Sequence, residues 1–320
     1  MKAAVHTRYG PPEVVKILDV PKPVANRDQL VVKVHATTVN QTDCHYRAAQ
    51  PFVMRFLSGL RRPRATVLGN EFAGEVEAVG EDVTAFSVGD RVFGYCEGQF
   101  GAHAEYIAVG QRSPVATMPA NVSYEQAAPA TEAAHYALSH INAAKISAGH
   151  SVLVYGATGG IGSAAVQLLK SVGAYVTAVC ATPHLELVRG LGPDKVVDYT
   201  AGDFAVDDRK YDVVFDAVGK STFGRCKPLL KPRGIYMSTG PGPAYINIVL
   251  PLATPLLRGK KVVFSFPRID QQMVERFRDL IEAGKFKPVL DRQYPLEQIV
   301  EAYQYTETGQ KVGNVVISLD

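Results

Sequence analysis

The sequence is poor in the features that mark disulfide-bonded, nucleic-acid-binding and membrane-spanning proteins. Its 320 residues include no tryptophan and only four cysteines, at positions 44, 96, 180 and 226, which form no CxxC pair. This spacing argues against a disulfide framework and against a clustered four-cysteine zinc site. A formal net charge of +3 is too small to favour a nucleic-acid partner. The chain also lacks an apolar run of about 18 residues and an apolar leader at its start, so we expect a cytoplasmic protein that spans no membrane.

The composition is otherwise typical of a soluble globular protein, with 47% apolar and 20% charged residues. A chain of this length favours about two domains. Residues 1 to about 118 hold short apolar runs separated by Gly and Pro, which is the pattern of a compact β-rich domain. The strands expected there are 30–34, 74–79, 91–95 and 104–109.

Helix and strand patterns alternate from about residue 123. Ser123 is suited to cap a helix, with Gln126 at its third position, and a helical apolar period continues from Ala127 to Ile141. Strands are expected at 152–155, 175–180, 195–197, 212–216, 234–238 and 261–264, with helical segments between them, as at 185–191 and 221–230. Repeated βα units of this kind predict an α/β domain with a doubly wound parallel sheet.

The C-terminal tail offers one amphipathic helix at 273–283, a helical segment at 296–306 and a strand at 314–319. It is too short to bury a core of its own. We therefore expect residues 1–122 and 267–320 to form one domain, into which residues 123–266 are inserted as a second.

A glycine-rich corner at residues 151–163 is the most informative segment of the chain. An apolar run ending at Tyr155 is followed by Gly156, Gly159, Gly160 and Gly162 and then by an apolar-periodic helix. A strand, a glycine turn and a helix N-terminus together make a site for a pyrophosphate, because free backbone N–H groups and the positive end of the helix dipole point at it. The corner predicts dinucleotide binding. The alternative is an ordinary turn in a sheet that binds no nucleotide.

Several further motifs accompany the corner in a fixed order along almost the whole chain. They are Tyr-Gly-Pro-Pro-Glu at 9–13, Val-Asn-Gln-Thr-Asp at 39–43, Leu-Gly-Asn-Glu-Phe-Ala-Gly at 68–74, Val-Gly-Asp-Arg-Val-Phe-Gly at 88–94, Asp-Ala-Val-Gly at 216–219 and Lys-Pro-Arg-Gly at 231–234. With them the sequence resembles the medium-chain dehydrogenase/reductase superfamily, in its zinc-free, quinone-oxidoreductase-like branch. The resemblance implies a GroES-like domain (1–122 and 267–320), a Rossmann domain (123–266), a cleft between them and a homodimer paired through strands around 261–265.

Zinc-dependent members of this superfamily place a Cys before the Thr-Asp pair and a His in a Gly-His-Glu triplet. The matching positions here are Asn40 and Asn70. Amide side chains are poor zinc ligands, so we expect no metal and a structural role for Glu71. Without a Lewis acid to activate an alcohol, the sequence favours reduction of an already polarised acceptor, namely a quinone or an α,β-unsaturated carbonyl compound.

The cofactor expected is NADPH, with NADH less favoured. The second strand of the α/β domain leads into Thr182 and His184 with no carboxylate before Glu186, whereas NAD-preferring sites have an acidic residue there. Thr182 is a hydrogen-bond donor for the cofactor, and His184 either meets the 2′-phosphate or is a solvated residue at a helix start. The resemblance adds further expected cofactor contacts, and with the corner residues the set is Gly156, Thr158, Gly159, Gly160, Ile161, Tyr199, Val218, Gly219, Thr239, Phe264, Phe266, Lys311 and Asn314. For Lys311 the alternative is an exposed lysine.

Four side chains are candidates for the chemistry. The Asn40 amide or the Tyr46 phenol is suited to polarise a carbonyl, although Asn40 can equally cap a turn and Tyr46 can equally be a packing residue. Glu132 and His135 are three residues apart on a helix, where they can pair and shuttle a proton. The alternative for this pair is a surface ion pair.

The leading interpretation is a zinc-independent NADPH-dependent reductase of quinones or α,β-unsaturated carbonyls that acts on a small apolar acceptor. The alternatives are a zinc-free alcohol or aldehyde oxidoreductase that uses Glu132 and His135, and a non-catalytic NADPH-binding protein. Residues 50–64 mix aromatics with four arginines, and we expect a solvated loop that packs its Phe residues inward, rather than a flap over the acceptor or a nucleic-acid surface.

Overall fold

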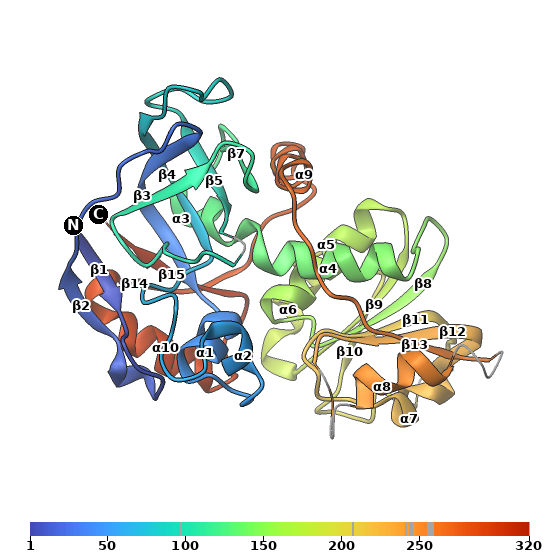
Figure 1. Ribbon diagram of the computed structural model, residues 1–320. Coiled ribbons are helices and arrows are strands. Elements are labelled where there is room, and N and C mark those ends of the chain that lie inside the picture. Colours follow the sequence, from blue (N-terminus) through green and yellow to red (C-terminus); the bar gives the residue numbers. More distant parts are fainter. Residues whose placement is uncertain (97, 207, 241, 243–245, 255–258, 320) are drawn as a thin grey trace. The chain divides into compact units, whose positions relative to one another are not determined.

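The computed structural model describes residues 1–319 apart from 97, 207, 241, 243–245 and 255–258, and apart from the side chains of 57, 252 and 253. The chain divides into two compact units (Figure 1). The first consists of Met1–Glu132 and Ile269–Asp320, and the second of Ala133–Arg268. Among the described residues, no helix combines the length and the apolar character needed to cross a bilayer.

The first unit is built on a mixed sheet with the strand order β14-β15-β3-β4-β5-β7, and β6 also pairs with β3. All its pairs are antiparallel except β14 with β15. A separate hairpin joins β1 and β2. The bounds are β1 (Lys2–Val5), β2 (Lys16–Asp19), β3 (Gln29–Val39), β4 (Glu71–Val79), β5 (Arg91–Tyr95), β6 (Tyr106–Gly110), β7 (Val115–Thr117), β14 (Leu290–Pro295) and β15 (Asn314–Ser318).

The C-terminal strand completes the sheet of the first unit. β15 pairs with β3, with Val315 opposite Val39. The first unit holds α1 (Gln41–Ala48), α2 (Met54–Ser58), α3 (Tyr124–Ala127), α9 (Gln271–Glu282) and α10 (Ile299–Glu307), with short 3-10 turns η1 (Pro12–Val14), η2 (Ala128–Ala130) and η7 (Leu296–Gln298). Its core has two main clusters, one around Leu30, Phe72 and Val92 and the other around Leu68, Tyr303 and Ile317.

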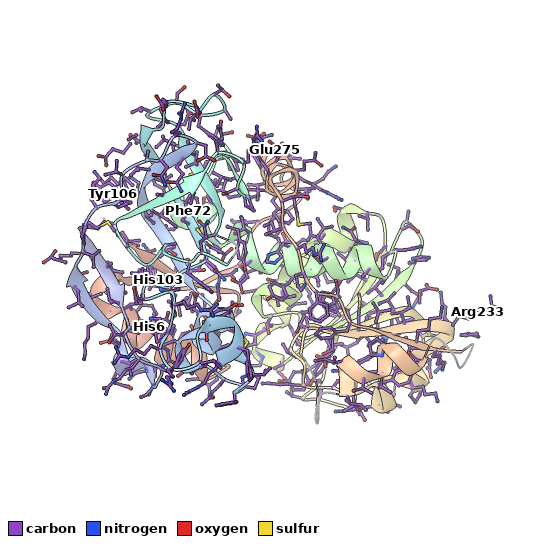
Figure 2. All side chains as sticks on the ribbon, in the orientation of Figure 1. His6, Phe72, His103, Tyr106, Arg233 and Glu275 are labelled. Carbon is purple, nitrogen blue, oxygen red and sulfur yellow. The ribbon has the colours of Figure 1, made fainter. Side chains whose placement is uncertain are left out.

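Figure 2 shows two fully buried side chains of the first unit, Phe72 and His103. A His103 ring nitrogen lies 2.8 Å from the backbone oxygen of Thr38. Burial lowers the pKa of His103 to about 4, so the ring is neutral at physiological pH. His103 therefore serves the packing of this unit, which agrees with the absence of any histidine cluster in the sequence.

The second unit is the predicted doubly wound domain. Its six strands are all parallel and follow the order β10-β9-β8-β11-β12-β13, which is the strand order 3-2-1-4-5-6 of dinucleotide-binding domains. The bounds are β8 (Ser151–Tyr155), β9 (Tyr175–Cys180), β10 (Lys195–Asp198), β11 (Tyr211–Asp216), β12 (Leu230–Ser238) and β13 (Lys261–Val263). The helical elements are α5 (Gly160–Ser171), η3 (Thr182–His184), α6 (Leu185–Gly190), α7 (Phe223–Cys226), η4 (Lys227–Leu229) and α8 (Ile246–Ala253).

The helix expected from Ala127 to Ile141 is interrupted. The Ser123 cap and Gln126 are present as predicted, but α3 and η2 end before Thr131, and a new helix, α4 (Glu132–Ala143), begins after it. Pro129 has no N–H to donate, and the N–H groups of Thr131 and Glu132 donate to the Glu71 carboxylate. The helix expected at 221–230 is likewise shortened to α7 and η4, since Pro228 lies in its path.

Candidate functional site

The junction of β3 and α1 is fixed by a reciprocal cap. The Asn40 side-chain oxygen accepts from the Asp43 N–H at 3.1 Å, and an Asp43 carboxylate oxygen accepts from the Asn40 N–H at 3.1 Å. The other Asp43 oxygen accepts from the Gly69 N–H at 3.0 Å, just before β4. The capping role considered for Asn40 is therefore confirmed, and the cap places its amide beside the start of β4.

Glu71, the first residue of β4, is a buried anchor for the start of α4. One carboxylate oxygen accepts from the Thr131 N–H (3.0 Å), the Thr131 hydroxyl (2.8 Å) and the Glu132 N–H (2.5 Å). The other accepts from the Thr38 hydroxyl at 2.7 Å. A carboxylate at this point also faces the positive end of the helix dipole. The structural role predicted for Glu71 is confirmed.

Glu132 joins three segments that are distant in sequence. One carboxyl oxygen accepts from the Asn40 amide at 2.5 Å and from the Asn70 amide, and the other accepts from the Thr42 hydroxyl at 2.6 Å. The Asn40 amide also donates to the Asn70 side-chain oxygen at 2.7 Å. Both amide hydrogens of Asn40 are thus in use, so polarisation of a substrate carbonyl by Asn40 would require one of these bonds to be exchanged. Thr42 and Asn70 were not among the predicted site residues.

The carboxyl groups of this network are too deeply buried to be ionised together. Burial raises the pKa of Glu132 well above its usual range, and the nearby carboxylates of Glu71 and Asp43 raise it further. Burial also raises the pKa of Glu71, and it raises that of Asp43 to about 7. These shifts favour the protonated form of Glu132, whereas four donors stabilise the charged form of Glu71.

Lys311 is partly buried, so it is not the exposed lysine considered as an alternative. Its ammonium group donates to the Gly313 carbonyl at 2.6 Å. Burial lowers the pKa of Lys311. Asn314 is buried at the start of β15 and donates to the Val289 carbonyl at 3.0 Å. Contact of either residue with a cofactor stays a prediction.

Tyr46 is a packing residue in the structure, which is one of the two roles considered for it. It is half-buried on α1, and its ring centroid lies 4.5 Å from that of Phe100. It lines a cavity of about 160 Å³ together with His6, Leu68 and Phe100. Burial raises the pKa of the phenol, which keeps it protonated and able to donate. Its role toward a substrate stays a prediction.

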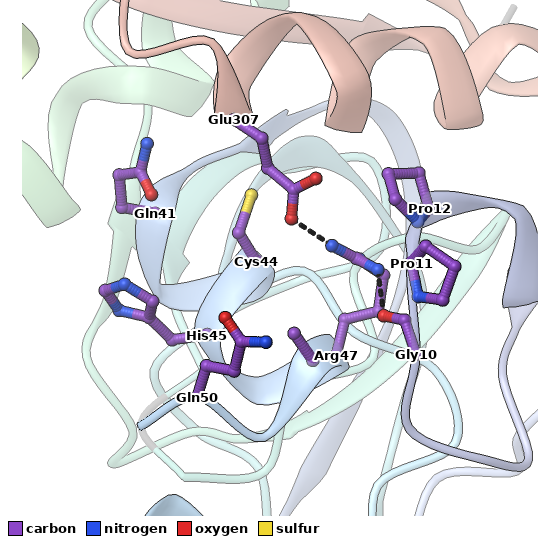
Figure 3. A pocket seen from close by; sticks show the side chains of 10 residues that line it. Gly10, Pro11, Pro12, Gln41, Cys44, His45, Arg47, Gln50 and Glu307 are labelled. Atoms are coloured by element: carbon purple, nitrogen blue, oxygen red, sulfur yellow. Dashed lines mark hydrogen bonds and ion pairs between the residues drawn. The ribbon is translucent and has the colours of Figure 1, made fainter. Parts of the chain in front are cut away.

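A larger pocket of about 550 Å³ opens beside α1 (Figure 3). Its lining includes Gln41, Cys44 and His45. In its wall the buried Arg47 side chain forms an ion pair with Glu307 and donates to the Gly10 carbonyl. The sequence contained no periodic or spacing signal for this pair, whose members are 260 residues apart.

Residues 50–64 differ from the expectation of a loop with its Phe residues inside. The side chains of Phe52 and Phe56 are 68% and 63% exposed, and their rings lie edge to face at 6.5 Å. α2 is too short to bury more than one face. Its inner face is occupied by Ser58, whose hydroxyl lies 2.8 Å from that of Tyr9. The Phe pair is left on the surface together with the Arg55 guanidinium, which lies over the Phe52 ring.

In the second unit the glycine corner has the geometry of a phosphate site. Gly156 has φ +81°, and a Cβ there would lie 2.5 Å from a Val218 methyl group. A Cβ on Gly162 would lie 2.1 Å from the Gly156 carbonyl oxygen. Gly159 precedes α5, whose first N–H groups have no acceptor within the helix. The predicted residues Thr158, Gly159, Gly160 and Ile161 thus lie at an open helix N-terminus.

Other predicted cofactor residues gather at the carboxyl ends of the same sheet. Asp216 accepts from the Val218 N–H and shapes the loop after β11, and Gly219 approaches Gly240 closely, which places Thr239 beside it. The Phe264 and Phe266 rings lie 5.2 Å apart after β13. Near β9 and β10, His184 ends η3, and Tyr199 is 45% exposed with its ring 6.0 Å from that of Tyr155. His135 lies on α4 with its ring 4.7 Å from that of Tyr136. Its pairing with Glu132 stays a prediction.

Comparison with known proteins agrees with this arrangement. Residues 26–120 match the alcohol dehydrogenase GroES-like domain, and residues 191–317 match a family described as zinc-binding dehydrogenase. The chain is 34% identical to 2-methylene-furan-3-one reductase of Solanum lycopersicum and 33% identical to a chloroplastic NADPH-dependent alkenal/one oxidoreductase of Arabidopsis thaliana. Each match covers 99% of this chain and 79% of the relative. The chain belongs to the medium-chain dehydrogenase/reductase superfamily, in its quinone-oxidoreductase-like branch.

Solved structures of the superfamily share both units. The quinone oxidoreductase of Coxiella burnetii matches with a TM-score of 0.88 and 26% identity, covering 100% of this chain and 99% of that one. A mycobacterial protein solved with NADPH matches with a TM-score of 0.79 and 26% identity, covering 100% of both chains. The GroES-like and Rossmann architecture predicted from the sequence is confirmed.

The first unit does not offer this superfamily's zinc ligands. Asn40 and Asn70 are the positions at which the resemblance implies Cys and His in zinc-dependent members, and their amide N–H groups point at Glu132. Zinc prefers thiolate and imidazole ligands, and amide N–H groups carry no free lone pair for it. The residues present therefore do not fit a catalytic zinc ion. The second unit does fit a dinucleotide, because the glycine turn leads into α5, whose first N–H groups have no acceptor within the helix and are suited to a pyrophosphate.

Proposed function

We propose that this protein is a zinc-independent, NADPH-dependent reductase of quinones or α,β-unsaturated carbonyl compounds. The observation that carries the proposal is the hydrogen-bonded group of Asn40, Asn70 and Glu132 at the superfamily's zinc position. An enzyme that cannot activate an alcohol through a metal is suited to an acceptor that is polarised already. Two relatives at 34% and 33% identity are named as reductases of such compounds.

When bound, the cofactor would supply a hydride, and the chain's own residues would bind the cofactor, hold the carbonyl group and supply the proton. The open N–H groups of the corner bind the pyrophosphate. When the hydride reaches the β-carbon, the electron pair of the C=C bond moves toward the carbonyl oxygen, and the resulting enolate takes one proton. When Glu132 is protonated, its hydrogen bond with Thr42 reverses: the carboxyl group donates to the Thr42 oxygen 2.6 Å away, the Thr42 hydroxyl passes its own proton onward, and solvent restores the proton on Glu132. The proposed groups that hold the carbonyl are Tyr46 and Asn40, the latter by exchanging one of its hydrogen bonds to Asn70 and Glu132.

The test is oxidation of NADPH and NADH by the purified protein with a panel of quinones, enones and alkenals, and with alcohols and NADP⁺ in the reverse direction. Turnover of the panel with NADPH ahead of NADH, in protein free of zinc by metal analysis, is expected. Stoichiometric zinc would contradict the metal-free proposal. Activity with alcohols alone would favour the alcohol oxidoreductase, and cofactor binding without any turnover would favour a non-catalytic protein.

Glu132→Gln separates a proton-holding role from a structural one. Gln can still accept from the Asn40 and Asn70 amides but has no acidic proton. We expect kcat for enones to fall more than tenfold with the affinity for NADPH unchanged, because one general acid contributes about 10²–10⁴-fold. Glu301→Gln, at an exposed glutamate on α10, is the matched control. Unchanged kcat in Glu132→Gln would remove this residue from the chemistry.

We also propose that the protein is a homodimer, as is usual in this branch. Light scattering on the purified full chain would measure the mass directly. A monomeric mass at assay concentration would contradict the proposal.

A further inference from the structure

A carboxylate that the sequence pattern did not reveal lies at the adenosine end of the parallel sheet. Asp198 is the last residue of β10 and lies opposite Cys180, the last residue of β9. One Asp198 oxygen accepts from the Thr182 hydroxyl at 2.5 Å. The other accepts from the Thr200 hydroxyl at 2.6 Å and from the Thr200 N–H at 2.8 Å. A carboxylate thus stands beyond the end of the second strand, although it comes from the third.

The position matters because β9 is the second strand of the dinucleotide fold. In such folds a carboxylate near the end of this strand accepts hydrogen bonds from the ribose hydroxyls of NAD, whereas a 2′-phosphate requires donors and positive charge. Thr182 gives its hydroxyl hydrogen to Asp198 and cannot give it to a phosphate at the same time. The hydrogen bonds from Thr182 and Thr200 lower the pKa of Asp198 to about 2, so the group is charged at neutral pH.

The first cationic side chain after Thr182 in the sequence, Arg189, does not neutralise the charge of Asp198. The Arg189 guanidinium on α6 forms an ion pair with Glu186, in the first turn of the same helix. The sequence argument for NADPH relied on the lack of an acidic residue between Thr182 and Glu186, and Asp198 fills that role from another strand. His184 and Tyr199 remain as the proposed partners of a 2′-phosphate.

We propose that Asp198 is a specificity-determining residue that narrows the preference for NADPH over NADH, so that the protein uses both dinucleotides. The inference rests on the proposed dinucleotide-dependent function. Loss of the carboxylate removes a like charge from the neighbourhood of the 2′-phosphate and frees the Thr182 hydroxyl to donate. We expect Asp198→Asn to raise NADPH affinity about five- to tenfold, on the order of one charge–charge repulsion at a solvent-exposed site.

The experiment measures dissociation constants of NADPH and NADH by titration calorimetry, without any acceptor, for the full chain. Asp198→Asn should tighten NADPH but should not tighten NADH, which has no 2′-phosphate for the carboxylate to repel. Asp198→Glu keeps the charge and should keep the original ratio. Asp203→Asn is the matched control, since Asp203 is an exposed carboxylate of the same unit that pairs with Arg225. Asp198→Ser provides a second charge-free variant if Asp198→Asn folds poorly.

Two outcomes would overturn the inference. If NADPH affinity in folded Asp198→Asn and Asp198→Ser is unchanged or weaker, the carboxylate does not act on the 2′-phosphate. If the gain is independent of ionic strength, it is not electrostatic, because repulsion at an exposed site weakens in salt. Failure of the original protein to bind either dinucleotide would instead refute the proposed function and this inference together, so the two failures are distinguishable.

Discussion

Gly162 offers a direct test of the glycine corner as a built phosphate site. A Cβ at this position would lie 2.1 Å from the Gly156 carbonyl oxygen, 2.8 Å from the Gly156 carbonyl carbon and 3.0 Å from the Ala157 Cα. All three are backbone atoms, so no side chain can rotate out of the way. Gly162→Ala must therefore widen the turn between β8 and α5.

Overpacking of this kind costs about 1–3 kcal/mol, which we expect as a loss in the free energy of unfolding measured with a chemical denaturant. Because the widened turn also moves the N–H groups of the first turn of α5, NADPH affinity should fall at least tenfold, as measured by calorimetric titration.

Gly190→Ala is the matched control. Gly190 is exposed at the end of α6, and a Cβ there meets no atom within 4 Å. The same substitution should therefore be neutral, or stabilising by about 0.5–1 kcal/mol through helix propensity, and should leave NADPH binding unchanged. Equal stability and equal NADPH affinity in the two variants would refute the assignment of Gly162 to a tightly packed phosphate turn.

Three further predictions concern the first unit. Burial raises the pKa of Asp43 from its ordinary value to about 7. Between about pH 4 and pH 7 the folded state therefore binds more protons than the unfolded state. The free energy of unfolding should fall as the pH rises through that window, by up to about 1.4 kcal/mol per pH unit. Denaturant unfolding across this range should show the slope, and Asp43→Asn should make it shallower, with Glu132, whose pKa is also raised by burial, contributing to the slope that remains. Glu307→Ala should lower the free energy of unfolding by about 2 kcal/mol, since it leaves the buried Arg47 without its ion-pair partner, whereas an exposed charge removed by Glu301→Ala should change it by less than about 0.5 kcal/mol. Replacing both Phe52 and Phe56 by Ala should leave the melting temperature unchanged, because both rings are exposed. If the two rings contact the acceptor, the KM for apolar enones should rise in this variant. An unchanged KM would exclude them from acceptor binding.

Most of the fold could be predicted because the apolar runs are short and are separated by Gly and Pro. The strand predicted at 91–95 agrees residue for residue with β5. The strand predicted at 30–34 is too short, because the second half of β3 mixes polar with apolar residues and so carries no continuous apolar run. Pro129 is a local signal for the break before α4, but the position of the new start could not be predicted, because the acceptor of the Thr131 N–H is 60 residues away. Local periodicity contains no information about such a partner.

The parts of the candidate site that consist of residues close together in the sequence could be predicted. The glycine corner is of this kind, as a turn that needs close backbone approach selects glycine in the sequence itself. The Asn40, Asn70 and Glu132 group is not, because its members come from three segments up to 92 residues apart. The contact of Asp198 with Thr182 was not predicted for the same reason, because it depends on the pairing of β9 with β10.

The pairing of β15 with β3 has a consequence for the order of events as the chain leaves the ribosome. The second unit is one uninterrupted stretch, so all its strands are available before the tail has been made, and a domain generally folds as a unit when its chain is complete. The first unit begins earlier in the sequence, but part of the edge of β3 stays unpaired until β15, which follows the second unit along the chain, has been made. An exposed strand edge is a template for pairing with other chains. The half of the protein that is translated first is therefore the half that is finished last, and its open edge is where chaperone protection would matter most.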